Sequence, residues 1–260
     1  MNDFVAFQMW KPFRQRLIKS HTFYFEQARQ RLLSRFENID TEAEQEMDDW
    51  LIETSHLFDP DRDDPADSYE AASEVGIEFY ELLTEMRDRT RLSVIAGMFH
   101  EWDKQLRDWL CSEIMRWHSG EILRQRVWSV DFTKIMDLLE AFGWEIRKTT
   151  YHQNLDGCRV LVNVYKHGDG KSFQDLRAYY PRYIEVPCSD PAHLEWSRGL
   201  ADYTNLKVTV QDIEAISDAI VTFWESVPEN VYVSQVINLP SWFEVALHKD
   251  NELRNRETSA

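Results

Sequence analysis

The chain has 260 residues, of which 43% are hydrophobic and 13% aromatic, and this composition excludes a disordered chain without a core. Its net charge of −17 excludes binding of nucleic acid through the whole surface. Three widely spaced cysteines without a CxxC pair favour neither a disulfide framework nor a zinc site, and we interpret them as buried, reduced thiols. The acidic N-terminus does not match a signal peptide and no apolar run reaches about 18 residues, so we expect a cytoplasmic protein without a membrane span.

Hydrophobic periodicity predicts a mainly α-helical protein. Amphipathic patterns, punctuated by glycine and proline, predict helices over residues 13–36, 40–58, 69–118, 131–142, 145–167, 172–179 and 211–226. The pattern over 69–118 is the longest, and it indicates either one helix or two stacked helices broken near Arg87–Thr90. Gly120 is interpreted as the C-cap of this element, and Ser172 as the N-cap of a later short helix.

Two short stretches near the C-terminus alternate as strands do. Lys207–Val210 and Val231–Ile237 are candidates to pair with each other as one β-hairpin. The expected fold is therefore a helical bundle with at most one short hairpin. We divide it into N-terminal helices with an acidic loop (1–68), a bundle (69–248) and a polar, mobile tail (249–260), which together form one compact unit.

Charge is distributed unevenly along the chain. Residues 37–70 contain 14 acids and one base, whereas residues 1–36 contain seven bases and two acids. Each region is either a solvated set of helix faces or a docking surface, the basic one for nucleic acid and the acidic one for a partner protein.

The segment Arg159–Gly170 carries the side chains most suggestive of chemistry. On a helix, Arg159, Asn163 and His167 lie on one face within about 12 Å along the axis, and Lys166 flanks them. Histidine is a general acid or base near neutral pH, and a basic side chain beside it can hold a phosphate. These are the parts required for metal-independent cleavage of RNA. The alternative is a buried hydrogen-bond network that caps the end of the helix.

The run Asn163-Val-Tyr-Lys-His-Gly-Asp-Gly170, preceded by Arg159 and followed by Ser172-Phe-Gln-Asp-Leu176, resembles the helical HEPN-type proteins of bacteria. The resemblance covers about residues 70–226. It implies a helical bundle with a basic residue and a histidine on a late helix. Many such proteins are ribonuclease toxins or defence proteins that act as dimers, and some are not catalytic.

The match to the family pattern is not literal. The family places four to six residues between arginine and histidine, whereas seven separate Arg159 from His167. Literal matches occur instead at Arg16–His21 and Arg147–His152. The segment around His100 and Glu101 resembles the helix that supplies an acidic residue near the signature.

The resemblance implies a metal-independent endoribonuclease in toxin–antitoxin or phage defence. Arg159 would hold the phosphate and His167 would act as acid or base. Asn163 and Lys166 would orient the scissile group, and Glu101 would support the histidine. RNA, a cognate antitoxin or other protein, and a second copy in a homodimer are the expected partners. The alternative function is a non-catalytic, protein-binding module of the same fold, and no motif indicates a metal, nucleotide or flavin cofactor.

Overall fold

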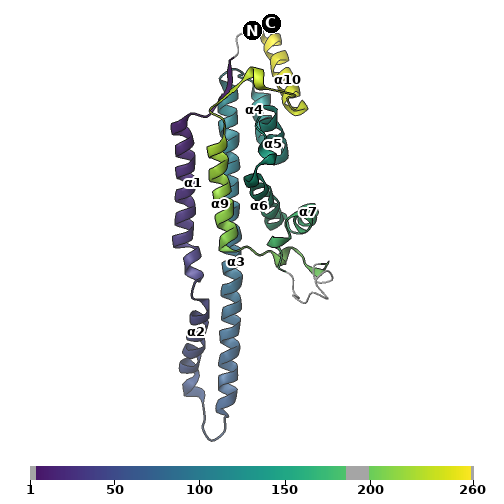
Figure 1. The fold of residues 1–260 in the computed structure, drawn as a ribbon. Helices are drawn as coiled ribbons and strands as arrows, with labels where there is room; N and C mark the ends of the chain where they lie inside the picture. The colour runs from purple at the N-terminus through teal and green to yellow at the C-terminus, as the bar shows by residue number, and fades with distance from the viewer. Residues whose placement is uncertain (1–3, 186–198, 259–260) are drawn as a thin grey trace.

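The computed structural model describes residues 4–185 and 199–258 as a mainly α-helical bundle (Figure 1), which confirms the predicted fold class. The α-helices are α1 (Lys11–Arg31), α2 (Ile39–Thr54), α3 (Pro65–Met115), α4 (Glu121–Ser129), α5 (Phe132–Ala141), α6 (Thr150–His167), α7 (Lys171–Tyr179), α9 (Val210–Ser226) and α10 (Ser241–Thr258). Two short strands, β1 (Val5–Gln8) and β2 (Asn230–Tyr232), form an antiparallel sheet. No helix within the described ranges is both long and apolar enough to cross a membrane.

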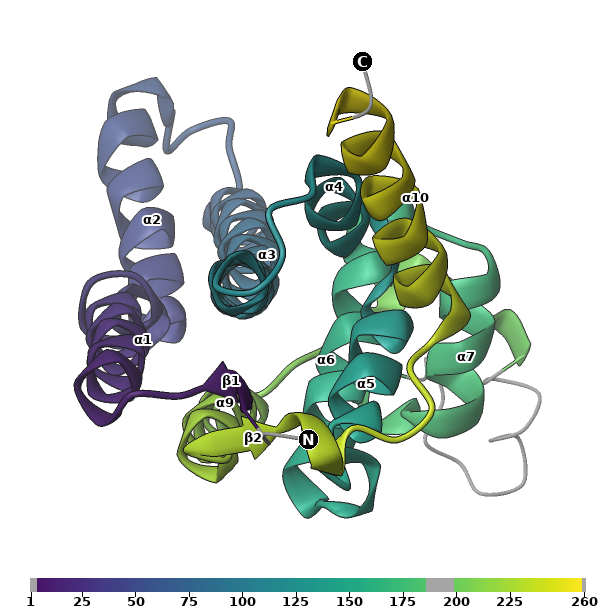
Figure 2. The same cartoon turned by 90° about the horizontal axis from the view of Figure 1, so that it is seen from above.

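Helix α3 is the axis of the molecule, with α1 and α2 on one side and α4 to α7 on the other (Figure 2). It has 51 residues, or about 75 Å of helix, and runs without a break through Arg87–Thr90. Of the two predicted alternatives, the single long helix is therefore the one observed. Asp64 caps its start by accepting a hydrogen bond from the Ala66 N–H, and Pro65 supplies the fixed φ of the first turn.

Only the second half of α3 lies in the main core. In its first half the buried residues are Ala72 and Gly76, and α2 is the helix that packs there. A Cβ on Gly76 would lie 3.2 Å from the Ala43 carbonyl oxygen, so glycine permits the close approach of the two helices. We call residues 37–88 the arm, because they project beyond the rest of the protein (Figure 1).

The remaining residues form the body, whose core joins the second half of α3 to α1, α5, α6 and α9. Aromatic side chains fill its centre. Trp102 of α3 meets Phe223 of α9 edge to face, with ring centroids 4.9 Å apart. Among the described cysteines, Cys111 and Cys158 are buried free thiols, as predicted, while Cys188 lies outside the described residues.

The sheet corrects the predicted hairpin. β2 pairs with β1 from the other end of the chain, with Phe7 opposite Val231, rather than with Lys207–Val210. That stretch is not a strand, because Thr209 forms a capping box with Asp212 at the start of α9. Of the predicted strand Val231–Ile237, only Val231 and Tyr232 belong to β2, because Val233–Gln235 forms a 3-10 helix. Local alternation also carried no information about the distant partner of β2.

Two predicted caps are also wrong. α3 ends at Met115, and Gly120 has a φ of −78° and precedes α4, so it is not a left-handed C-cap. Ser172 lies inside the first turn of α7, whose N-cap is Gly170. Gly120 is needed for space instead, since a Cβ there would lie 2.0 Å from an oxygen of Asp250.

The polar C-terminal segment is helical rather than a mobile tail, because α10 continues to Thr258 and packs on α4. Asp250 is buried, and its carboxylate accepts hydrogen bonds from the Ile122 and Leu123 N–H groups, both at 2.9 Å. The carboxylate also contacts Nε2 of buried His118 at 3.1 Å. Asp250 therefore caps the start of α4 from a distance of over a hundred residues along the chain.

Candidate functional site

Helix α6 has one buried face and one polar stripe. It ends at Gly168, whose φ of 70° suits glycine and whose N–H bonds the Val164 carbonyl at 2.8 Å. The polar stripe comprises His152, Asp156, Arg159, Asn163 and Lys166, at spacings of three and four residues. The predicted stripe is thus present, and it extends further towards the start of the helix than Arg159.

The middle of this stripe is a closed network. Arg159 Nε donates to Asp156 Oδ1 at 2.8 Å, and the Tyr180 hydroxyl donates to Asp156 Oδ2 at 2.7 Å. Burial alone would raise the pKa of Asp156, but these two hydrogen bonds outweigh it and lower the pKa. Arg159 is therefore occupied by a carboxylate, about 12 Å along the helix axis from His167.

The start of the stripe contains the literal Arg–His match. Burial lowers the pKa of His152, and Asp156 and Arg147 are close enough to modify it in opposite directions. The Arg147 side chain is committed to α5, where it pairs with Glu140 and donates to Asp137 Oδ1 at 2.6 Å. In this half of α6 the polar side chains form a hydrogen-bonded network, as the predicted alternative held, but the network joins neighbouring elements instead of capping the end of the helix.

The C-terminal end of α6 has a different character. Lys166 and His167 are exposed, and Asn163 is half-buried. His100 of α3 lies near Lys166: partial burial lowers the pKa of this imidazole, and the positive charge of Lys166 lowers it further. A contact of 2.9 Å between the Tyr165 hydroxyl and Ser93 Oγ holds this end of α6 against α3.

Two glycines follow the C-terminal end of α6. Gly170 has a φ of 155°, and a Cβ built on it would meet nothing within 4 Å. This end of the helix therefore carries exposed Lys166 and His167, with exposed His100 of α3 within electrostatic range of Lys166. Such a set can bind an anion and exchange protons.

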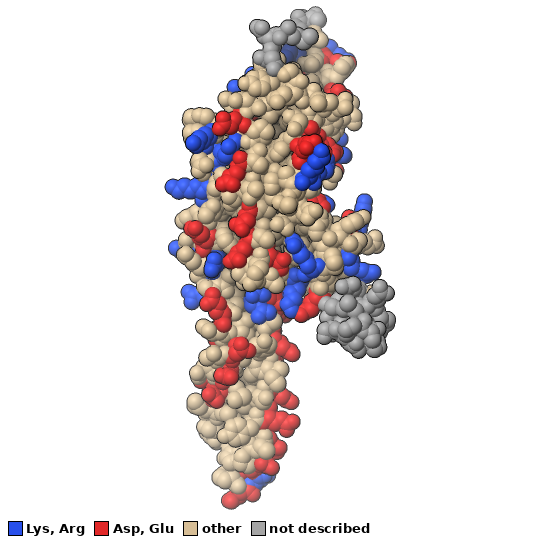
Figure 3. Space-filling model, in the orientation of Figure 1, with Lys and Arg blue, Asp and Glu red and all other residues tan. Residues whose placement is uncertain are grey.

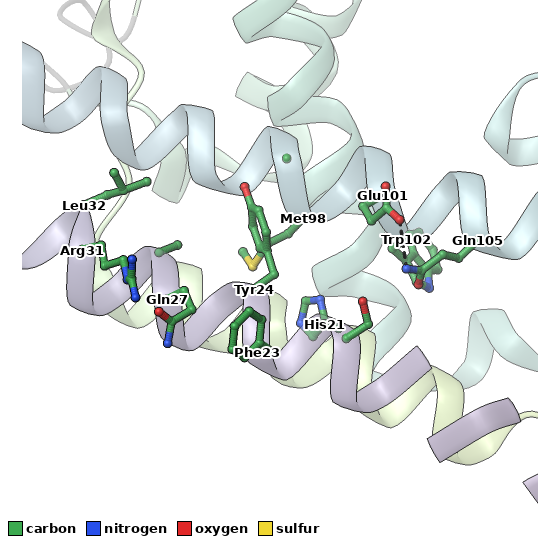
Figure 4. Close-up of a pocket in the computed structure, with 13 residues that line it drawn as sticks. His21, Phe23, Tyr24, Gln27, Arg31, Leu32, Met98, Glu101, Trp102 and Gln105 are labelled. Carbon is green, nitrogen blue, oxygen red and sulfur yellow. Dashed lines mark hydrogen bonds between the residues drawn. The ribbon is translucent and has the colours of Figure 1, made fainter. Parts of the chain in front are cut away.

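Glu101 does not lie at this end of α6. It lines a groove between α1 and α3, where Gln105 Nε2 donates to its Oε1 at 3.1 Å (Figure 4). Successive residues on a helix are about 100° apart, so His100 faces α6 while Glu101 faces α1. The structure thus places Glu101 on the α1 side of α3 rather than beside His167, while the neighbouring His100 is within electrostatic range of α6.

The other literal match, Arg16–His21, is structural at its histidine. His21 is buried, its Nε2 lies 3.0 Å from Ser217 Oγ, and burial lowers its pKa to about 4. Arg16 is stacked over the Phe13 ring, 4.9 Å from its centroid.

No protein-family model, curated protein or solved structure matches this chain. The resemblance to HEPN-type proteins therefore stays a prediction from the residues of 159–176. Within residues 4–185 and 199–258, no group of three or more histidine, cysteine or acidic side chains is placed to hold a metal ion.

Proposed function

We propose that the protein is a metal-independent endoribonuclease whose site lies at the C-terminal end of α6. The proposal is supported by the approach of α6 to α3 at this end, where Tyr165 contacts Ser93 at 2.9 Å and His100 lies within electrostatic range of Lys166, whose charge helps to lower the pKa of the imidazole. A histidine with a pKa below its ordinary value of about 6.5 is neutral at pH 7, which is the state required of a general base. The adjacent ammonium is suited to a phosphate.

Each side chain then has a role in one balanced reaction. His100 removes the proton from the ribose 2′-hydroxyl, and O2′ attacks the adjacent phosphorus. Lys166 stabilises the charge on the non-bridging oxygens. His167 donates a proton to the departing 5′-oxygen. The products are a 2′,3′-cyclic phosphate and a free 5′-hydroxyl.

The two remaining residues on α6, Asn163 and Arg159, would position other groups rather than take part in proton transfer. Asn163 lies one turn before His167 and is half-buried, so it is placed to orient the ribose or phosphate. Arg159 is a positioning residue in this scheme, because its guanidinium is bound to Asp156 rather than free for phosphate.

The test is cleavage of total RNA by purified protein in the presence of a chelator. We expect products with 2′,3′-cyclic phosphate ends, and no cleavage of DNA, which lacks the attacking hydroxyl. His100→Ala and His167→Ala should each lower the rate by roughly 100-fold, the usual loss of a general acid or base. His248→Ala is the matched control, since His248 is an exposed histidine on α10.

The pH profile tests the assignment of the base. The rate of the wild-type protein should fall as the pH drops through the lowered pKa of His100, and this limb should disappear in His100→Ala. Full activity of both histidine variants, or cleavage that requires a divalent metal, would contradict the proposal.

A further inference from the structure

A groove follows the interface between α1 and α3 on the opposite side of α3 from His100. It consists of two hollows of about 590 and 410 Å³. Tyr24 of α1 and Leu32, which directly follows α1, line both hollows, and Figure 4 shows them in the first. The Tyr24 hydroxyl packs against Gly97 of α3, where any Cβ would lie 2.3 Å from it.

The groove has exposed apolar side chains, whereas the surface of a soluble protein is usually polar. Phe23, Leu82 and Met86 line it and are 63%, 57% and 58% exposed. Its floor includes Trp102, a buried side chain whose indole Nε1 has no hydrogen-bond partner among the described residues. Contiguous apolar surface of this kind, with a polar rim, marks an interaction site.

The shape of the groove suits a helix. The α3 residues that line it recur at intervals of three or four between Leu82 and Gln105, so they form one face of a straight helix about 35 Å long. A third helix laid between α1 and α3 would present side chains at the same intervals to this face.

Charge indicates what kind of helix would bind. The arm contains 19 acids and two bases, and the rest of the chain contains 27 of each, so the arm accounts for the entire net charge of −17. Figure 3 shows acidic side chains along the arm. Within the part of the chain that the structure describes, the acids of the arm form ion pairs only at Glu85 and Asp88.

These acids continue the line of the groove. Within the groove Glu85 is paired with Arg89, and Glu101 is accompanied by Arg31, so the excess of acid lies beyond its end. There the exposed residues Glu81, Glu78 and Glu74 precede Glu85 at spacings of four, three and four along the same side of α3. Like charges one helical turn apart repel, so this arrangement weakens the isolated arm. The arm of a second copy would add to this repulsion, whereas a basic segment would relieve it.

We infer that the groove between α1 and α3 binds an amphipathic helix of a partner protein, with an apolar face and a polar face rich in lysine and arginine. The apolar face covers Phe23, Leu82 and Met86, and the basic side chains reach the acids of the arm. This inference does not depend on RNA cleavage at α6.

The test uses three fluorescent synthetic peptides of about 24 residues, long enough to fill the groove as helices. The first is an amphipathic helix of leucine and lysine, the second has the same composition in scrambled order, and the third replaces lysine with glutamate. Anisotropy titrations measure their binding to the full-length protein. We expect saturable binding of the first peptide, and binding at least roughly tenfold weaker for the other two.

Two sets of variants locate the site. Leu82→Ser with Met86→Ser should raise the Kd of the first peptide roughly tenfold, as expected when two exposed apolar contacts of the groove are lost. Glu74→Gln, Glu78→Gln and Glu81→Gln together should raise the Kd at low salt and flatten its dependence on salt. The matched control is Ile237→Ser with Val245→Ser, which removes exposed apolar side chains outside the groove.

Three results would overturn the inference. Equal binding of the scrambled peptide would mean that charge alone attracts it. An equal loss in the control variant would place binding elsewhere. Failure to bind the amphipathic peptide, together with a concentration-dependent dimer in sedimentation that Leu82→Ser abolishes, would assign the groove to a second copy.

Discussion

Replacing Asp250 with alanine should destabilise the protein far more than its position near the C-terminus suggests. The Asp250 carboxylate is buried and satisfies the Ile122 and Leu123 N–H groups at the start of α4, as well as His118. Each backbone N–H left buried without an acceptor costs about 1–3 kcal/mol. Water entering the vacated space offsets part of this, so we expect the free energy of unfolding to fall by about 3–4 kcal/mol.

Denaturant unfolding followed by circular dichroism measures this loss. Glu252→Ala is the matched control, because Glu252 lies half a turn further along α10 with an exposed side chain, and it should change stability by no more than about 0.5 kcal/mol. A loss from Asp250→Ala as small as that of the control would refute the assignment of Asp250 as the cap of α4.

The same residue predicts a pH dependence. Burial opposes the charged carboxylate, but the hydrogen bonds from His118 and from the Leu123 and Ile122 N–H groups lower the pKa of Asp250 in the folded state. A lowered folded pKa stabilises the protein above the unfolded value of about 3.9, and this contribution is lost as the pH falls through the folded pKa. The stability difference between wild type and Asp250→Asn should therefore narrow below about pH 4.

Two further predictions concern stability. Burial lowers the pKa of His21 to about 4, so between about pH 6.5 and pH 4 only the unfolded chain binds a proton at this residue. As the pH is lowered through that interval, the free energy of unfolding should fall by up to about 3 kcal/mol. Unfolding curves of His21→Phe should lack this pH-dependent loss. Gly76→Val should push α2 away from α3, because its Cβ would lie 3.2 Å from the Ala43 carbonyl oxygen. We expect a loss of about 1–3 kcal/mol, with faster hydrogen exchange of α2 amides, whereas Ser73→Ala on the exposed side of the same helix should change neither.

Local features of the fold could be predicted from the sequence. The helix predicted over 131–142 is observed as α5, shorter by one residue at each end, because Asp131 is its N-cap and Gly143, with a φ of 80°, follows its end. The pairing of β1 with β2 and the capping of α4 by Asp250 join opposite ends of the chain. Periodicity and cap signals depend only on residues close together in the sequence. They therefore could not predict these two long-range contacts.

The candidate site was predicted only in part, because the sequence does not show which side of α3 faces α6. The stripe on α6 follows from spacing within one helix and is present. The choice of Glu101 over His100 required knowing how α3 is rotated relative to α6, and one residue changes that direction by about 100°. Arg159 was matched to His167 by family resemblance, whereas the structure gives it a nearer partner in Asp156.

The unbroken α3 has a mechanical consequence. His100 and Glu101 are consecutive residues of one straight helix, so the candidate ribonuclease site and the floor of the groove share a single helical turn. The same backbone hydrogen bonds run from that turn to the tip of the arm, without a proline to act as a joint. α3 therefore joins the acidic residues of the arm to His100 through one continuous helix, 26 residues from Glu74 to His100.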